Sequence, residues 1–434
     1  MTDTGFAPRR AALGILTNVR RGMPFDAALD RGLSGLPEVD RRLAHELAAG
    51  VLRQQGSLDA LLTLFVPRGL PSVQPSVLDI LRIGAYQLHH LARVPPHAAV
   101  ATSVALVRET AGDRVTGFAN AVLRRVADAP RDQIRNDGDN ATATLAARWS
   151  HPEWLVARWL DRFGTAATER LLEWNNTHPA LVVQPARDDP DSLQERFSAA
   201  EVQGFPAPHG AGIVVGETRP ERLPGFAEGA FYVQDPAQAL VLRFASFPAD
   251  ATVYDACAAP GGKTLGLARR AIGVVAADAS RRRILRLCDN IARAGRGNAF
   301  PVLADALHPP IAGASAYLLD APCLGTGTFA RHPDARLRVH PDALRRIVSE
   351  QAALLDAAAN VMAPGGVLCY ATCSLEPEED EAQVAAFLDR HPQFSRQPPS
   401  GFPTELLTPE GDLLILPQRD GMDGAYAARL VCDR

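Results

Sequence analysis

The sequence predicts three domains in order: an all-α domain over residues 1–130, a small α/β domain over 145–230 and a doubly wound α/β domain over 231–434. Apolar residues recur at helical spacing in the first 130 residues, and short apolar runs alternate with polar turns up to about residue 230. From there, strand and helix patterns alternate. A chain of 434 residues has room for two to four domains of ordinary size.

The first 130 residues carry the pattern of a compact helical domain. Prolines at Leu70-Pro71, Pro75 and Pro95-Pro96 mark breaks between helices. The polar stretch 131–142 that follows is expected to be a linker. Three apolar sets mark helices: Leu43, Leu47, Val51 and Leu52, then Val77, Leu81, Leu88 and Leu91, and then Phe118, Ala121, Val122 and Val126.

The two later domains differ in the spacing of their apolar runs. Residues 150–164 predict a helix, and Leu181–Val183 and Ile213–Val215 predict short strands. After residue 230, strands alternate with amphipathic helices, which is the pattern of a parallel sheet covered by helices on both faces. Strands are predicted at Thr252–Ala256, Gly273–Ala277, Phe300–Ala304, Tyr317–Leu319 and Val367–Ala371, with terminal strands at Leu413–Leu416 and Tyr426–Val431.

Composition excludes several classes of protein. With 47% apolar and 22% charged residues, the chain is not disordered throughout, and no run of about 18 apolar residues predicts a transmembrane helix. The N-terminus lacks the apolar core of a secretory signal, and no cysteine precedes Cys257, which does not suit a disulfide framework. We therefore expect a cytoplasmic protein. The net charge is −4, yet residues 1–126 contain 15 Arg and 10 acidic residues, a bias that permits contact with a polyanion.

Lysine is nearly absent from the chain. Of the 45 basic residues, 44 are arginine, and Lys263 is the single lysine. Codon bias accounts for the general preference. A compact ammonium is not interchangeable with a planar guanidinium where space is tight, so Lys263 is a candidate functional residue.

A turn of small residues, Cys257-Ala258-Ala259-Pro260-Gly261-Gly262-Lys263, follows the first predicted strand of the C-terminal domain. It departs from a phosphate-binding loop because Cys257 stands where that loop needs glycine, and a dinucleotide fingerprint is also absent. Such a turn lets a ligand approach the backbone, and the N-terminus of the helix that follows favours a carboxylate or another anion.

Acidic residues follow the next two strands, at Asp278 and Asp305. Ligands of doubly wound sheets bind outside the carboxyl ends of the strands, and an acid about 20 residues past the glycine turn suits ribose hydroxyls. Each acid alone is more often a helix cap or a solvated side chain. Together with the glycine turn they describe a slot for a nucleoside without phosphates, which suggests S-adenosylmethionine as cofactor.

Two cysteines lie at matching strand ends, in Asp320-Ala-Pro-Cys323 after the fourth strand and in Tyr370-Ala-Thr-Cys373 after the fifth. A lone cysteine is usually a small buried apolar residue. A zinc site is disfavoured, because His332 is the one histidine near Cys323 and no closely spaced pair of cysteines accompanies it. The ordinary buried role is expected for the others, Cys257, Cys288, Cys369 and Cys432.

DACAAPGGKT (255–264), DAPCLGTGT (320–328) and YATCS (370–374), in this order, resemble the RNA cytosine-carbon-5 methyltransferase family. The N-terminal region resembles the NusB antitermination factor fold, a pairing typical of small-subunit (16S) rRNA methyltransferases. The resemblance implies an all-α NusB-like domain, a small α/β linker domain and a Rossmann-like S-adenosylmethionine-dependent methyltransferase domain. It covers nearly the whole chain, since SHPEWLVARWL (150–160), LPGF (223–226), VQDPAQAL (233–240) and RHPDARLR (331–338) also look like segments of this family.

The resemblance implies roles for individual residues. Cys373 would attack carbon 6 of cytosine, Cys323 would assist the final elimination, and Asp320 would hold the edge of the base and aid protonation at nitrogen 3. Residues 257–263 with Asp278, Asp305 and Asp320 would hold the cofactor. The implied partner is 16S rRNA, bound by the first two domains of a monomer that uses neither a metal nor a membrane.

Three positions depart from the family pattern: Leu324 stands in place of serine, Leu337 in place of tryptophan and Ala425 in place of an aromatic residue. None is a reacting group, so the departures bear on substrate fit. Two alternatives remain: the same chemistry on tRNA or at another rRNA site, and a non-catalytic RNA-binding protein of the antitermination type. The intact cysteine motifs and glycine turn count against the second.

Overall fold

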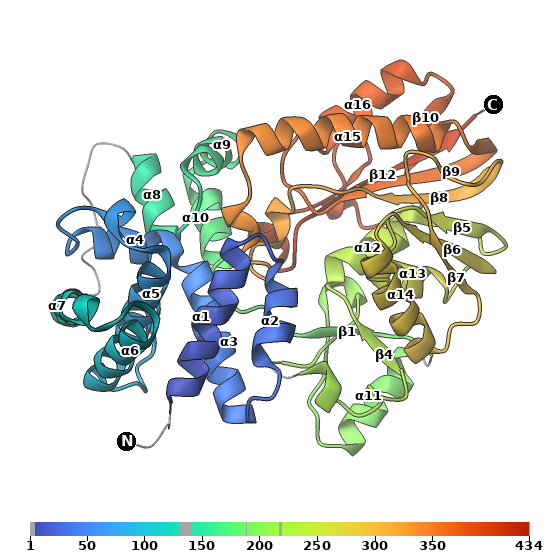
Figure 1. Ribbon diagram of the computed structural model, residues 1–434. Coiled ribbons are helices and arrows are strands. Elements are labelled where there is room, and N and C mark those ends of the chain that lie inside the picture. The colour runs from blue at the N-terminus through green and yellow to red at the C-terminus, as the bar shows by residue number, and fades with distance from the viewer. Residues whose placement is uncertain (1–4, 131–140, 188, 217–218, 434) are drawn as a thin grey trace. The chain divides into compact units, whose positions relative to one another are not determined.

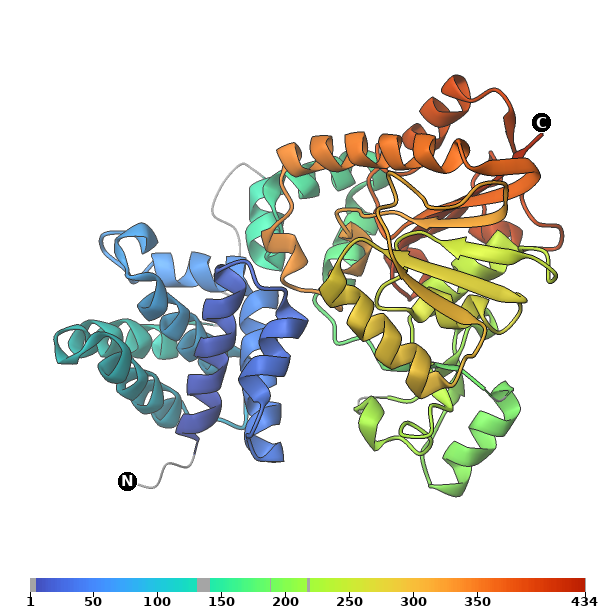
Figure 2. The same cartoon turned by 45° about the vertical axis from the view of Figure 1, so that its right-hand side comes forward.

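The computed structural model describes residues 5–130, 141–187, 189–216 and 219–433, which form two compact units (Figures 1 and 2). The first unit contains the chain up to Thr177 together with Phe329–Arg338, and the second contains His178–Thr328 and Val339–Arg434. The chain therefore leaves the second unit soon after Cys323, contributes Phe329–Arg338 to the first unit and then returns. We call Phe329–Arg338 the strap.

Residues 5–130 are helical, as predicted, and the first unit also takes in three helices between residues 141 and 174 that the sequence analysis placed at the start of the small α/β domain. The three apolar sets fall on α3, α5 and α7, although Leu91 lies just past the end of α5 and Ala121 is exposed on α7. The predicted linker 131–142 falls mostly outside the described residues, and its last two residues begin α8. The helices are α1 (Phe6–Arg20), α2 (Phe25–Leu33), α3 (Glu38–Arg53), α4 (Gln55–Thr63), α5 (Pro75–His90), α6 (Pro96–Ala111), α7 (Asp113–Asp128), α8 (Ala141–Trp149), α9 (Glu153–Phe163) and α10 (Thr165–Trp174).

Helix α5 is the centre of this unit, because it contacts α1, α3, α4, α6 and α7. Its approach to α3 is close: a Cβ added at Gly50 would lie 2.0 Å from the Tyr86 ring. Prolines begin both α5 and α6, where the missing amide hydrogen is not needed. The proline breaks of the sequence are therefore helix starts. None of the helices that the structure describes combines the length and hydrophobicity needed to cross a membrane.

The strap is fixed in the first unit by a buried arginine. Arg336 is 2% exposed, and its guanidinium donates to the carbonyl oxygens of Arg53 at 3.0 Å and Asn175 at 2.7 Å and to Asn176 Oδ1 at 2.9 Å. Burial, followed by the charge of Arg53, lowers the pKa of Arg336 to about 9. Arg53 in turn donates to the strap carbonyl of Ala330. Neutral acceptors alone solvate this guanidinium, so its position depends on backbone from α3 and α10.

We predict that Arg336→Ala lowers the free energy of unfolding by on the order of 3 kcal/mol, because it leaves several buried carbonyl groups without a donor. Arg10→Ala is the control, since Arg10 forms an exposed ion pair with Glu109 and should contribute less than about 1 kcal/mol. Urea denaturation of the full chain measures both. Equal effects of the two substitutions would contradict the anchoring role of Arg336.

The second unit begins with a small antiparallel sheet in the order β2-β3-β1-β4. Val183 on β1 and Phe231 on β4 pack with Phe197 of α11 in its core. The predicted strands at 181–183 and 213–215 are confirmed as β1 and β3 to within two residues. The elements are β1 (Val182–Pro185), α11 (Pro190–Ala199), β2 (Phe205–Pro206), β3 (Ile213–Val214) and β4 (Phe231–Val233).

The large sheet has the order β10-β12-β9-β8-β5-β6-β7, and β11 pairs with β12. Helices α12, α13 and α14 cover one face, and α15 and α16 cover the other (Figure 1). The elements are α12 (Pro236–Ala245), β5 (Thr252–Asp255), α13 (Gly262–Leu267), β6 (Gly273–Asp278), α14 (Arg281–Ala294), β7 (Ala299–Leu303), β8 (Ala314–Asp320), α15 (Pro341–Ala359), β9 (Met362–Thr372), α16 (Glu381–Arg390), β10 (Phe394–Arg396), β11 (Leu413–Ile415), α17 (Pro417–Asp420) and β12 (Ala425–Cys432).

The sheet is parallel only from β9 through β8, β5 and β6 to β7. Strand β12 runs antiparallel to β9 and to both of its other partners, β10 and β11. Nine residues separate β11 from β12, fewer than a parallel crossover needs. The expectation of a parallel sheet therefore holds for the core of the sheet and not for its C-terminal strands.

Candidate active site

The predicted site residues meet at the carboxyl edge of the parallel strands. Asp255, Asp278 and Asp320 are the last residues of β5, β6 and β8, and Cys373 directly follows β9. These strands are neighbours in the sheet, and parallel strands place their carboxyl ends on one side. Residues up to 118 positions apart in sequence are therefore brought to one edge.

Two thiols lie in contact at this edge. The sulfur atoms of Cys323 and Cys373 are 3.3 Å apart, and the Cys373 amide also points at the Cys323 sulfur at 3.4 Å. The contact with Cys373, followed by burial, raises the pKa of Cys323 well above its usual range. Cys323 is therefore the thiol of the pair whose ionisation the site disfavours.

A single buried carboxylate holds the two cysteine loops together. Glu379 Oε2 accepts from the amide of Leu324 at 2.9 Å, and its Oε1 accepts from the Ser374 hydroxyl. Leu324 follows Cys323 and Ser374 follows Cys373, so one side chain grips the residue after each thiol. Gln351 of α15 donates to the same carboxylate at 3.0 Å. We call these contacts of Glu379 with the two cysteine loops the clamp. Leu324 takes part through its backbone amide, so the departure from serine at this position leaves the clamp intact.

Backbone hydrogen bonds support the same arrangement. The Gly327 amide donates to the Cys373 carbonyl at 3.0 Å, and the Gly424 amide donates to the Gly327 carbonyl at 2.8 Å. A Cβ at Gly327 would lie 2.7 Å from the Gly424 Cα, so this crossing requires glycine. The approach to β12 thereby braces the Cys323 loop.

Lys263, the last residue of the glycine turn, joins the turn to Asp320 at the end of β8. Its ammonium donates to Asp320 Oδ2 at 2.8 Å and to the Gln238 side chain, and its side chain is 11% exposed. Burial lowers the pKa of Lys263, but the charges of Asp320 and Cys373 outweigh that effect and raise it overall. The ammonium and a Cys373 thiolate therefore attract each other. The position of Lys263 between two acceptors suits a compact ammonium, which supports its selection from the sequence as a candidate functional residue.

The glycine turn is tightly packed. Gly261 has a φ of 108°, and a Cβ there would meet Leu287 of α14 at 2.6 Å, so two constraints require glycine. The Ala258 amide donates to the Ala277 carbonyl at 2.9 Å, and the Pro260 carbonyl accepts from Asn290. Burial raises the pKa of Cys257 to about 12, which agrees with an unreactive thiol.

The acids at the ends of β5 and β6 are buried and incompletely satisfied. Asp278 is 1% exposed, and its Oδ1 accepts from the Ser280 amide and pairs with Arg283, whereas its Oδ2 has no partner among the described residues. Asp255 Oδ1 is similarly unpaired, and burial raises the pKa of Asp255 to about 7. An acceptor buried without a donor at this edge fits a ligand that brings hydroxyl groups.

Asp305 follows β7 and differs from the other acids. It is exposed, and its Oδ1 caps its own turn by accepting from the Leu307 amide at 2.9 Å. Its other oxygen lies 3.7 Å from His308. Asp305 is therefore at the expected strand end but retains only one oxygen for a ligand. The described residues contain no group of three or more His, Cys, Asp or Glu side chains that could hold a metal ion.

Comparison with known proteins identifies the family. Three family descriptions match the chain: the NusB family over residues 7–128, the RsmF/B-like ferredoxin-like domain over 151–220 and 16S rRNA methyltransferase RsmB/F over 245–431. A Synechocystis protein named probable ribosomal RNA small subunit methyltransferase B is 33% identical, with 97% of this chain and 98% of that protein covered. The Salmonella typhi ribosomal RNA small subunit methyltransferase B is 34% identical over 97% of both chains. The chain belongs to the RsmB/F methyltransferase family.

Solved structures agree with this assignment at the level of the fold. PH0851 has a TM-score of 0.81 and 23% identity over 98% of both chains. NSun6 from Pyrococcus horikoshii, solved with SFG, has a TM-score of 0.57 and 18% identity and covers 65% of this chain and 98% of its own. The predicted fold class is confirmed: a NusB-like helical region, a ferredoxin-like region and an α/β methyltransferase sheet. The RsmB/F methyltransferases use S-adenosylmethionine, which confirms the predicted cofactor.

Several residues of this RsmB/F site escaped the sequence analysis. Glu379 lies in the acidic run Glu376-Pro-Glu-Glu-Asp380, which reads as a solvated segment, yet it is fully buried. Gln238 lies in the segment VQDPAQAL (233–240), but nothing in the sequence predicts its hydrogen bond with Lys263. For Glu379, the one sequence signal is that the acidic run directly follows the Cys373 motif.

We predict that Glu379→Ala slows the formation of a Cys323–Cys373 disulfide by a mild oxidant such as diamide. Loss of the clamp frees both loops, so the two sulfur atoms meet less often. Labelling of free thiols followed by mass spectrometry measures the rate. Glu350→Ala is the control, because Glu350 is exposed on α15 beside Gln351. Unchanged oxidation rates in Glu379→Ala would show that the clamp does not set the sulfur separation.

Proposed function

We propose that this chain methylates carbon 5 of one cytosine in 16S rRNA, with Cys373 as the nucleophile. The observation that carries the proposal is the contact of two thiols at the strand ends, beside the Lys263 ammonium. The names of the relatives at 33–34% identity over nearly their full length support the small-subunit substrate. We also propose domain boundaries of 1–130, 145–230 and 231–434, with the first two domains holding the RNA.

Attack by sulfur activates the base. Carbon 5 of cytosine is a poor nucleophile, and a bond from the Cys373 thiolate to carbon 6 converts the ring to an enamine that is nucleophilic at carbon 5. Lys263 stabilises the thiolate before attack, and Asp320 holds the edge of the base and assists protonation at nitrogen 3. Bound S-adenosylmethionine supplies the methyl group.

The second thiol completes the reaction. Once Cys373 is bonded to carbon 6 its sulfur carries no charge, so the interaction that contributes most to the raised pKa of Cys323 is removed. Cys323 can then release its own proton to solvent. As a thiolate it takes the proton from carbon 5 while the bond between carbon 6 and Cys373 breaks and nitrogen 3 returns its proton to Asp320. Methylated cytosine leaves, and the Cys373 thiolate is restored.

The cofactor would lie along the glycine turn. Residues Cys257, Ala258, Ala259, Pro260, Gly261, Gly262 and Lys263 would contact its amino-acid end. Asp278 would accept from its ribose hydroxyls through the unpaired Oδ2, and Asp305 would contribute its remaining oxygen. Asp320 lies between this group and the cysteines.

The two cysteines should give opposite results when the adduct is trapped. Cys373→Ala removes the nucleophile, so no covalent complex should form with RNA that carries 5-fluorocytosine at the target. Cys323→Ala should still permit attack and methyl transfer, and should accumulate as a covalent complex with methylated RNA. A denaturing gel with labelled RNA measures both. Trapping by Cys373→Ala and not by Cys323→Ala would reverse the assignment.

Bisulfite mapping tests the substrate. In total RNA from a strain that lacks this chain, one cytosine of 16S rRNA should lose its protection, because only methylated cytosine resists deamination. Restoring the wild-type chain should restore protection, and restoring Cys373→Ala should not. Loss of protection in a tRNA or in the large-subunit rRNA instead would support the alternative substrate and refute the proposed one.

A further inference from the structure

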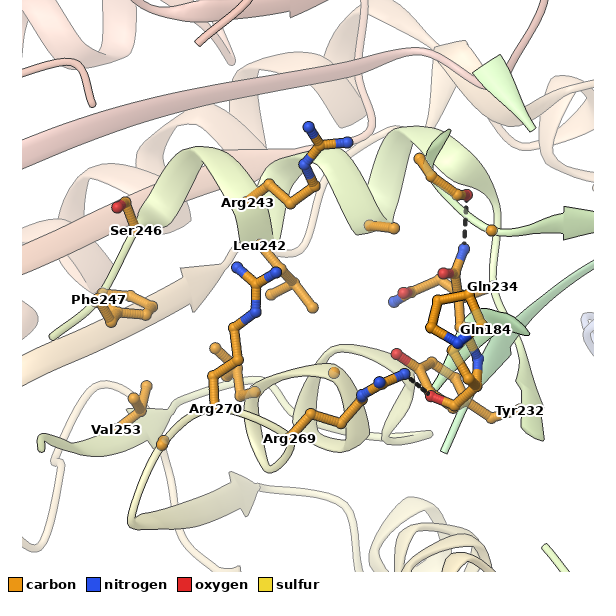
Figure 3. Close-up of a pocket in the computed structure, with 18 of the residues that line it drawn as sticks. Gln184, Tyr232, Gln234, Leu242, Arg243, Ser246, Phe247, Val253, Arg269 and Arg270 are labelled. Atoms are coloured by element: carbon orange, nitrogen blue, oxygen red, sulfur yellow. Dashed lines mark hydrogen bonds between the residues drawn. The ribbon is translucent and has the colours of Figure 1, made fainter. Parts of the chain in front are cut away.

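The second unit contains a cavity of about 280 Å³ between the small sheet and the helices α12 and α13 (Figure 3). Its polar lining comes from Gln184 on β1, Tyr232 on β4, Gln234 just after β4, Arg243 on α12, and Arg269 and Arg270 just after α13. None of the proposed catalytic residues lines it. We call this space the arginine cavity.

The lining is positively charged. It contains three guanidinium groups, and no carboxylate is present among its lining residues. Arg243 donates to the His209 carbonyl at 2.6 Å and Arg269 donates to the Pro185 carbonyl at 2.5 Å, so both are held by neutral acceptors and retain further N–H groups. Arg270 is exposed, and its guanidinium forms no hydrogen bond or ion pair within the described chain. A lining with three cations and no carboxylate favours an anionic group such as a phosphate.

The deep side of the cavity holds an unsatisfied amide. Gln234 is 8% exposed, its side chain lines the cavity, and its buried Oε1 has no hydrogen-bond partner among the described residues. The Tyr232 hydroxyl on the same side also lacks a partner there. A buried amide left unpaired costs roughly 1–3 kcal/mol, so this arrangement favours an occupant that supplies both a donor and an acceptor. The edge of a nucleobase supplies both.

Apolar side chains complete the lining. Leu242 and Phe247 from the end of α12 and Val253 from β5 offer a surface against which a flat ring can pack. A polar edge, an apolar wall and a cationic mouth are what a base with its phosphate requires. The cavity volume suits one base, and Arg243 and Arg270 are exposed at the surface, where a phosphate can stay in solvent.

We propose that the arginine cavity binds a second nucleotide of the RNA substrate, distinct from the target cytosine, with its base at Gln234 and its phosphate at Arg243, Arg269 and Arg270. Gln234 also adjoins the glycine turn, since a Cβ at Gly262 would lie 3.3 Å from its Nε2. The cavity and the cofactor turn therefore share one side chain. This inference rests on the proposed function, because it assigns the cavity to the same RNA.

Steady-state methylation of a target rRNA fragment tests the phosphate contact. Arg270→Glu should raise KM about tenfold and leave kcat and the affinity for S-adenosylmethionine unchanged. Arg346→Glu is the matched control, because Arg346 is an exposed arginine of α15 without a partner in the described chain, on the other face of the sheet. Equal KM values for the two variants overturn the inference. Absence of methylation by the wild-type chain would instead overturn the proposed function.

Abasic substitutions along the fragment test the base contact. At one position outside the target, loss of the base should weaken binding to the wild-type chain by roughly tenfold and should have no further effect in Gln234→Ala. Additive effects at every position overturn the inference. Titration with the four free nucleoside monophosphates tests whether the phosphate comes from a free nucleotide or from the RNA strand. If a monophosphate binds as tightly as the RNA fragment and Arg270→Glu abolishes that binding, the cavity is a site for a free nucleotide. That result would overturn the assignment to the RNA strand.

Discussion

The cysteine pair depends on one buried carboxylate that belongs to neither cysteine motif. Glu379 accepts hydrogen bonds from the residue after Cys323 and from the residue after Cys373, and Gln351 fixes it from α15. Burial raises the pKa of Glu379, while the three donors lower it. A carboxylate can remain buried only when its lone pairs are satisfied, so the two loops and the glutamate order one another. The sulfur separation of 3.3 Å follows from that mutual requirement.

The charges around this pair form a second constraint. Asp255, Asp278 and Asp320 end adjacent strands, and Lys263 is the cation placed among them. The ammonium pairs with Asp320 and attracts the Cys373 sulfur, while burial raises the pKa of Asp255 to about 7. The ammonium bridges Asp320 and Gln238, a pair of contacts that suits a compact cation better than a planar guanidinium.

The strap connects the segment that carries Cys323 to the helical unit. It begins at Phe329, a few residues after Cys323, and its Arg336 is solvated by carbonyls of α3 and α10. The strap also receives a hydrogen bond from the Phe25 amide through Asp334. A helical region joined only by a linker at its end could be removed without consequence for the rest of the fold. Here its removal would take the Arg53 carbonyl from Arg336 and the Phe25 amide from Asp334, so the NusB-like region helps to hold the strap.

The sequence by itself determined the order of the domains, most of the strands, and the acids and thiols at the strand ends. Apolar periodicity locates strands and helices, and the carboxyl ends of parallel strands meet at one edge, so Asp278, Asp305, Asp320, Cys323 and Cys373 could be predicted to converge. Only the tertiary structure decided the direction of β12, because an apolar run reads alike in parallel and antiparallel strands. It also decided the burial of Glu379, Gln234 and Arg336. Side chains of these types usually face solvent, and a local pattern contains no information on which distant backbone groups will enclose them.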